Sequence, residues 1–321
     1  MKRFIIMICV VVAVAGLWTA GWFYIAQRVG AEVAMLAEAD GESVPRVTCE
    51  DLQVDGFPFH FAPRCTNAEI VMGDYDITLG QLQGTVLFYR PTHIQFFAAG
   101  PLEIADAFTG SRQQVTWSDM RGSVRLDGDR IGRISVLANN IVYADALFGD
   151  AVFGEAEHAE IHLVDATGSE GHDGLGAALD YFARIDGLES GPAEIENGTI
   201  TLDGRLTGLP PMDVWGHPDA LRIWQANDGV LSVRAIDAVA QDASLSASGD
   251  LHLDELGRLN GVIELTASGI RERLGDMEES QLVDVFLGSP DAQGMHRQSV
   301  TARNGTLVVG IIPVFALTPL F

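Results

Sequence analysis

Cysteine and lysine are scarce in this chain of 321 residues. Three cysteines exclude a disulfide-dense scaffold and a zinc module built from several cysteines. Lysine occurs once, as Lys2, so the other 19 basic residues are arginines. With 44 acidic residues the formal net charge is −24, which argues against nucleic acid as a partner and against adhesion of the body to anionic headgroups.

Sequence motifs for nucleotide binding and hydrolysis are also missing. The chain has no P-loop, no G-x-G-x-x-G, no G-x-S-x-G and no H-E-x-x-H. The best metal candidates are His158, Glu160 and His162, which share one face if the segment is a strand. A solvated polar face is the interpretation that we favour for them. We therefore expect a protein that is not an enzyme and has no cofactor, with a metal-dependent hydrolase as the less favoured alternative.

One long uncharged run, residues 4–26, stands at the N-terminus. Its 23 residues exceed the roughly 20 that span a bilayer core. Lys2 and Arg3 precede it, which favours a cytoplasmic N-terminus and a body on the other side. Trp18, Trp22 and Tyr24 would then lie toward the outer interface. A signal peptide cleaved after Ala13-Val14-Ala15 is the alternative.

The chain beyond this run is strongly acidic. Without Lys2, Arg3 and Arg28, 17 basic residues face 44 acidic ones, a formal charge of −27. We expect a single-pass protein of a bacterial inner membrane, held by residues 1–30, with its body in the periplasm.

Two cysteines outside the anchor, Cys49 and Cys65, flank a Gly-Phe-Pro-Phe segment. Asp55-Gly56 is a turn signal, and a hairpin folded about Phe57 would place residue 49 opposite residue 65. This spacing, in an oxidising compartment, predicts a cross-strand disulfide.

Alternation of apolar and polar residues dominates the body and predicts antiparallel strands with one wet face. On these strands Leu126, Leu202 and Leu251 would point to the apolar side, and Arg125, Asp203 and His252 to water. The fold class is mainly β (α+β): a long, strongly curved antiparallel sheet with a few covering helices. Helices are expected over 174–187, 218–225 and 270–287. The body divides into 31–170 and 171–321, or forms one domain, 31–321.

A long sheet with few helices must hide its apolar face. It can close on itself, accept helices, or form an open half-barrel groove that holds lipid. The candidates for lining such a groove are Phe57, Phe59, Phe61, Leu126, Leu202 and Leu251. The same residues in a closed core are the alternative.

The order of these features resembles a known family. A single N-terminal span, then Cys49, then Val54-Asp55-Gly56-Phe57-Pro58-Phe59, then Cys65 is similar to a domain-of-unknown-function family of anchored envelope proteins in Gram-negative bacteria. The ending, residues 304–310 and 317–320, is similar too. The opening also resembles, more weakly, AsmA-like periplasmic lipid-binding proteins, which implies a β-sheet groove with an apolar interior. The functional expectation is binding or transfer of lipid or another apolar ligand, and the alternative is an envelope assembly scaffold without a ligand.

Overall fold

A computed structural model describes residues 2–42, 45–147, 151–168, 176–192, 194–215, 217–270 and 285–321. The chain forms two compact units. Unit 1 comprises residues 1–123 and 142–151, and unit 2 comprises residues 124–141 and 152–321. The division of the body that the sequence predicts, after residue 170, stays a prediction.

The first element of unit 1 is the 36-residue helix α1 (Lys2–Ala37). It contains the uncharged run, and it is long and apolar enough to cross a membrane. Nearly all of its side chains before Trp18 are exposed, as expected for a helix whose apolar surface has no protein partner there.

Strands make up most of the remaining described residues. They are β1 (Arg46–Asp55), β2 (His60–Met72), β3 (Tyr75–Leu87), β4 (Arg90–Asp106), β5 (Arg112–Thr116), β6 (Asp119–Asp127), β7 (Arg130–Asp145), β8 (Val152–Asp165), β9 (Ala177–Ser190), β10 (Ile195–Leu209), β11 (Val230–Ala240), β12 (Ala243–Leu253), β13 (Leu259–Ser268), β14 (His296–Arg303), β15 (Thr306–Val309) and β16 (Ile312–Ala316). The short helices η1 (Met212–Val214) and α2 (Ala220–Ala226) interrupt them in unit 2.

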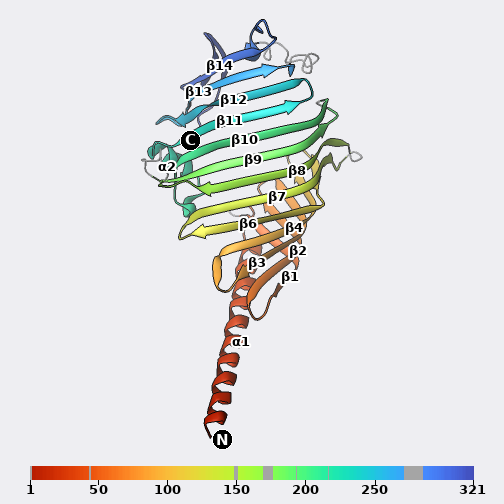
Figure 1. Cartoon of the computed structure of the whole chain (residues 1–321), viewed down its shortest axis with the longest axis vertical. Helices are drawn as coiled ribbons and strands as arrows, with labels where there is room; N and C mark the ends of the chain where they lie inside the picture. The colour runs from red at the N-terminus through yellow and green to blue at the C-terminus, as the bar shows by residue number, and fades with distance from the viewer. Residues whose placement is uncertain are drawn as a thin grey trace. The chain divides into compact units, whose positions relative to one another are not determined.

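Hydrogen bonds join these strands into one sheet in nearly sequential order (Figure 1). The order is β1-β2-β3-β4-β5-β7 and onward to β16, and β6 pairs with β4 and β7. Each strand whose register the structure gives is antiparallel to its neighbours. The mainly β fold class, the antiparallel sheet, the scarcity of helices and the apolar N-terminal helix are thus confirmed.

The helix predicted over 174–187 is wrong, because residues 177–190 form β9. Leu179 and Phe182 have helical spacing with Leu175, but Leu179, Tyr181 and Ala183 also alternate with period 2. Pairing with β8 on one side and β10 on the other satisfies the backbone of β9 and selects the strand. The short helix predicted near residues 218–225 is confirmed as α2. Most of the helix predicted over 270–287 lies outside the described residues.

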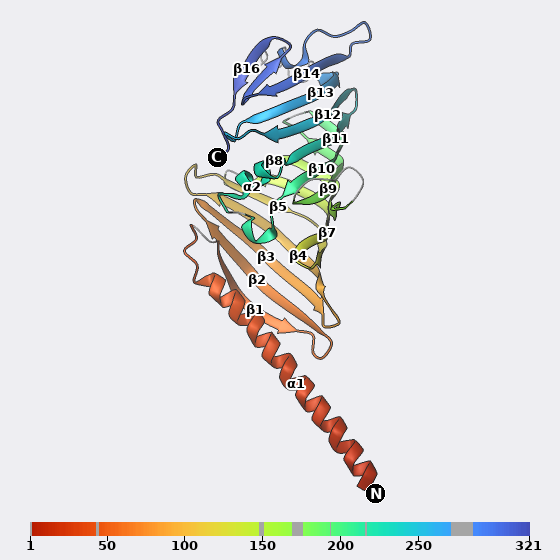
Figure 2. The same cartoon turned by 90° about the vertical axis from the view of Figure 1, so that its left-hand side faces the viewer.

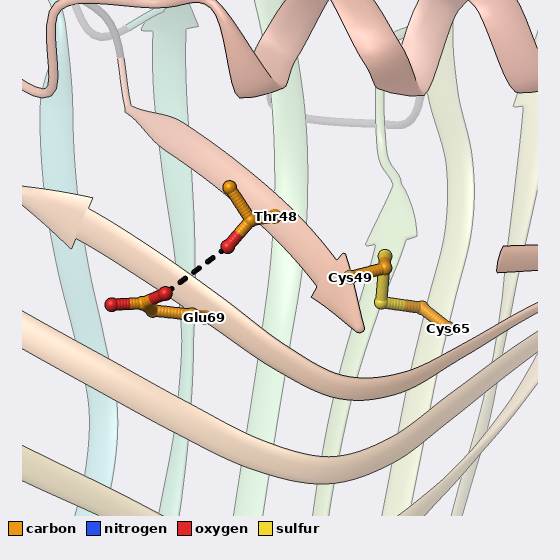
Figure 3. Close-up of a disulfide and its surroundings, with 4 residues drawn as sticks. All are labelled: Thr48, Cys49, Cys65 and Glu69. Carbon is orange, nitrogen blue, oxygen red and sulfur yellow. Dashed lines mark hydrogen bonds between the residues drawn. A yellow bond between two sulfur atoms is a disulfide. The ribbon is translucent and has the colours of Figure 1, made fainter. Parts of the chain in front are cut away.

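The predicted disulfide joins Cys49 to Cys65, with 5.4 Å between the Cα atoms (Figure 3). The register predicted for its hairpin is wrong. Cys49 pairs with Ala68 and Leu52 pairs with Cys65, since the connection between β1 and β2 centres beyond Phe57. The bridge therefore runs diagonally across the two strands, beside Asn67, whose φ of 47° marks a local distortion of the ladder. A hydrogen bond of 3.2 Å from Thr48 to Glu69 adds a second link nearby.

The disulfide should stabilise unit 1 by restricting its unfolded state. The Cys49→Ser/Cys65→Ser double variant should lower the free energy of unfolding by roughly 3 kcal/mol, as expected for a closed loop of this length. Chemical denaturation of the full-length protein in detergent measures the loss. Cys9→Ser, at an exposed position of α1, is the matched control and should change nothing. An equal stability for the double variant and the wild type would contradict the entropic role.

Candidate functional site

One face of the sheet in unit 2 is apolar across its strands. The registers from β8 to β13 align apolar side chains into four cross-strand rows. Three rows begin in β8, whereas the fourth begins in β9 because Asp165 of β8 pairs with Leu179, and two rows continue into β14 and β15. We call these the apolar rows. They consist of Ala159-Ile185-Ile200-Ala238-Leu245-Ala267; Ile161-Ala183-Leu202-Ile236-Ala247-Leu265; Leu163-Tyr181-Gly204-Val233-Gly249-Ile263-Val300-Val309; and Leu179-Leu206-Leu231-Leu251-Gly261-Ala302-Leu307.

The size of this face follows from strand geometry. The rows extend about 20 Å along β10 and about 24 Å across six strands, on the order of 500 Å² in all. Among the described residues, no side chain in the four rows carries a charge. Apolar patches of this size on soluble proteins are commonly binding surfaces.

A cavity lies at each end of the face. Ile131, Leu179 and Leu209 form a buried cluster at one end, against which Met212 of η1 packs. A cavity of ≈ 200 Å³ adjoins this cluster and is also lined by Trp215. At the opposite end of β9 and β10, Leu188, Ile195 and Ile200 line a second cavity of ≈ 220 Å³.

The helices η1 and α2 lie at the first of these ends, and Ile270 lines the cavity at the second. α2 contacts β10, where Trp224 Nε1 donates to the Thr207 carbonyl at 2.7 Å. Toward the middle of the face Leu202 remains half-buried, and Ile161 at the β8 side is 51% exposed. In the described part of unit 2 the centre of the apolar rows thus has no helix over it.

Tyr181 carries the one hydroxyl of the apolar rows. Its ring lies over Gly204, where an added Cβ would sit 2.1 Å from the Tyr181 hydroxyl oxygen. The hydroxyl donates to the Ser232 carbonyl at 3.0 Å, and burial raises the pKa of Tyr181. The absence of a side chain at Gly204 therefore leaves room for the Tyr181 ring, whose hydroxyl is the one polar group in an otherwise apolar surface.

The opposite face of the same strands is polar and held together by ion pairs. Arg205 binds Asp180 through two hydrogen bonds of 2.8 and 3.0 Å, and Arg234 reaches both Asp180 (3.0 Å) and Asp203 (2.6 Å). The hydrogen bonds from Arg205, with the charge of Arg234, hold the pKa of Asp180 below its ordinary value. This network holds β9, β10 and β11 together on their polar face. Most apolar side chains of these strands therefore point to the opposite face.

His158, Glu160 and His162 belong to this polar face of β8. His162 Nε2 lies 3.0 Å from Glu160 Oε2, but His158 Nδ1 turns to Asn139 Oδ1 at 2.8 Å. The second nitrogen of His162 lies 2.9 Å from Ser135 Oγ. The three side chains therefore do not converge. The described residues hold no group of three or more His, Cys, Asp or Glu side chains arranged around a metal position.

The six groove candidates from the sequence fall into both units. Leu202 and Leu251 lie in the apolar rows, and Leu126 lies half-buried in β6 of the same unit. Phe57, Phe59 and Phe61 belong to the β1–β2 hairpin of unit 1.

In unit 1, α1 and the hairpin form an aromatic cluster that the sequence pattern did not reveal. Trp22 is 6% exposed and stacks on Phe61 with ring centroids 5.4 Å apart. The ring centroids of Trp18 and Phe88 lie 4.5 Å apart. Tryptophans near the end of an apolar helix are typical of a membrane interface, so nothing local in the sequence indicated that these two have protein partners.

The fold and surface define a class: a mainly β protein whose antiparallel sheet has one apolar and one ion-paired face, preceded by an apolar helix. Residues 22–317 match the family model described as an uncharacterized protein conserved in bacteria, DUF2125. The chain belongs to this family, since the match covers most of its length. A comparison with curated proteins finds no match.

The ion pairs of the polar face predict a specific pH dependence. Because the folded-state pKa of Asp180 is lowered, its contribution is present above about pH 4 and is lost as the pH falls further. Asp180→Asn should cost about 1 kcal/mol at pH 7, and this difference from wild type should shrink below pH 4. Denaturation at pH 7 and pH 3 measures it, with Asp213→Asn, at an exposed position, as the control. A difference that is independent of pH would contradict the assignment.

Proposed function

We propose that this protein is a membrane-anchored envelope protein whose apolar rows bind the acyl chain of a lipid. α1 spans the inner membrane of a bacterium, and the body that follows it lies on the periplasmic side. The protein performs no chemistry on the lipid; it holds the chain away from water and supports its passage within the envelope.

The observation that carries the proposal is the continuity of the apolar rows. Water in contact with such a face costs roughly 25 cal/mol for each Å² of apolar surface, so an occupant that covers it is strongly favoured. A bilayer leaflet is about 15 Å thick in its hydrocarbon part, half the bilayer core. An acyl chain of that length fits within the extent of the rows. Tyr181, with its hydroxyl bound to Ser232, leaves no unsatisfied polar group facing the chain.

The location is supported by independent features. The Cys49–Cys65 disulfide suits an oxidising compartment such as the periplasm. The basic pair Lys2 and Arg3 before the uncharged run favours a cytoplasmic N-terminus. The strong negative charge of the body keeps it from lying flat on anionic headgroups, so that α1 is its main attachment to the membrane.

A lipid-binding role also agrees with the resemblance of the opening segment to AsmA-like proteins. The alternative, an assembly scaffold, would use the same face to bind another protein. Both roles need a partner of apolar character, and they differ in what is bound to the rows in the cell.

A photoreactive lipid separates these alternatives. A bifunctional lipid that carries a diazirine in its acyl chain and an alkyne for capture is fed to cells, and cross-linked peptides are mapped by mass spectrometry. Peptides from β9 to β12 should be labelled in the wild type. Leu202→Glu should reduce this labelling several-fold, because a carboxylate is costly to bury next to an acyl chain.

Two controls keep this test clear. Thr201→Glu adds the same charge one residue away on the polar face, where Arg184 and Asp237 are its cross-strand neighbours, and should leave the labelling unchanged. Labelling of α1, which contacts bulk lipid, is the internal standard for each variant. Circular dichroism establishes folding, and Leu202→Thr is the milder variant if Leu202→Glu unfolds. Labelling confined to α1 in the wild type would reject lipid binding by the apolar rows.

A further inference from the structure

The ends of two hairpins in unit 1 carry exposed aromatic side chains. One is the connection between β1 and β2, with Phe57 and Phe59, and the other is the connection between β3 and β4, with Phe88 and Tyr89. These four residues are between 48 and 68% exposed. We call residues 57–60 and 87–89 the hairpin tips. They lie side by side, because the Phe88 amide donates to the Phe59 carbonyl at 3.2 Å and His60 pairs with Leu87.

The hairpin tips are fastened to α1 by hydrogen bonds and ring contacts. Trp18 Nε1 donates to the Pro58 carbonyl and Trp22 Nε1 to the His60 carbonyl, each at 3.0 Å. Pro58 at the tip thus meets the helix four residues closer to its N-terminus than His60 does. The β1–β2 hairpin therefore points along α1 toward the N-terminal end of the helix. Figure 2 shows this direction for the ends of β1 and β2 beside α1.

The length of α1 then fixes the depth of the tips in a membrane. A hydrocarbon core of about 30 Å takes about 20 helical residues, which run from Phe4 to Phe23. Trp18 lies five residues, or about 7.5 Å, inside that boundary. Tilting the helix adds residues to the span, and a core of about 27 Å still needs 18 of them, up to Gly21. With either core thickness, Trp18 and the hairpin tip bound to it lie within the hydrocarbon core.

The chemistry of the tips suits that depth. An apolar cavity of ≈ 350 Å³ lies between α1 and the hairpins, lined by residues such as Leu17, Trp18 and Phe88. Lipid chains fill such a space without the cost that water would incur. His60 is the one ionisable residue of the tips, and it lies at their base, where β2 begins. The charged side chains that flank the tips, Asp55 and Arg90, stand where headgroups and water begin.

We infer that the hairpin tips are a second membrane-contact surface, immersed in the outer leaflet of the membrane that α1 spans. This inference rests on the anchoring role of α1 in the proposed function, and it does not depend on lipid binding by the apolar rows. Its consequence is that unit 1 is held at a fixed depth against the bilayer, with its strands starting inside the lipid.

The test measures the depth of single labelled cysteines in full-length protein. Phe59→Cys and Tyr89→Cys are made in a Cys9→Ala background, labelled with bimane, and reconstituted into vesicles of palmitoyl-oleoyl phosphatidylcholine. Phe108→Cys is the matched control, because Phe108 is an aromatic residue of the same unit that is 85% exposed. It lies beyond the opposite end of β4, about 50 Å from the tips along the strand.

Nitroxide lipids, labelled on the acyl chain, should quench bimane at residues 59 and 89 several-fold more than at residue 108. Aqueous iodide should show the reverse order. Equal quenching at all three positions, in protein that floats with the vesicles, would overturn the inference while leaving the anchor intact. Shielding from iodide without nitroxide quenching would also overturn it, because the tips would then contact protein. Protein that fails to float would reject the anchor and the inference together.

Discussion

The structure depends on one constraint, the preservation of side-chain parity from strand to strand. In a sheet, a slip of one residue moves every side chain of a strand to the other face. From β8 to β13 the registers keep apolar side chains aligned in four rows, even past the bulge between Asp203 and Gly204. The ion pairs of Asp180 with Arg205 and Arg234 hold the same strands from the polar side. Most apolar side chains of these strands therefore lie on one face, with Val164, Val239 and Val262 as exceptions on the other. The functional question that follows is what occupies the apolar face.

Much of this architecture could be predicted from the sequence, because period-2 alternation is a local property. The segments around Leu202 and Leu251 alternate in the sequence and lie in the apolar rows. The segment around Leu179 satisfies two periods at once, and only pairing with β8 and β10 selects the strand. The register predicted for the β1–β2 hairpin is wrong for a similar reason. The disulfide fixes which cysteines meet, but the length of the connection, which the sequence does not display, determines which residues pair.

The candidate surfaces differ in how far they could be foreseen. The apolar rows follow from alternation once the strand order is known, since antiparallel neighbours in sequence are neighbours in space. The contact between α1 and the hairpin tips could not be foreseen, because Trp18 and Trp22 are ordinary for a membrane interface and have hydrogen-bond partners about 40 residues away. The two surfaces, one in each unit, have apolar character in common, which is why we propose lipid as the partner of both.

The central claim is that a lipid chain covers the apolar rows. The most direct measurement is a high-resolution structure of the full-length protein extracted from cell membranes into lipid nanodiscs without detergent. We expect elongated, unbranched density along the rows between Leu202 and Leu251, shielded from solvent. Rows that are covered instead by the protein's own side chains, or by a second protein, would contradict the claim.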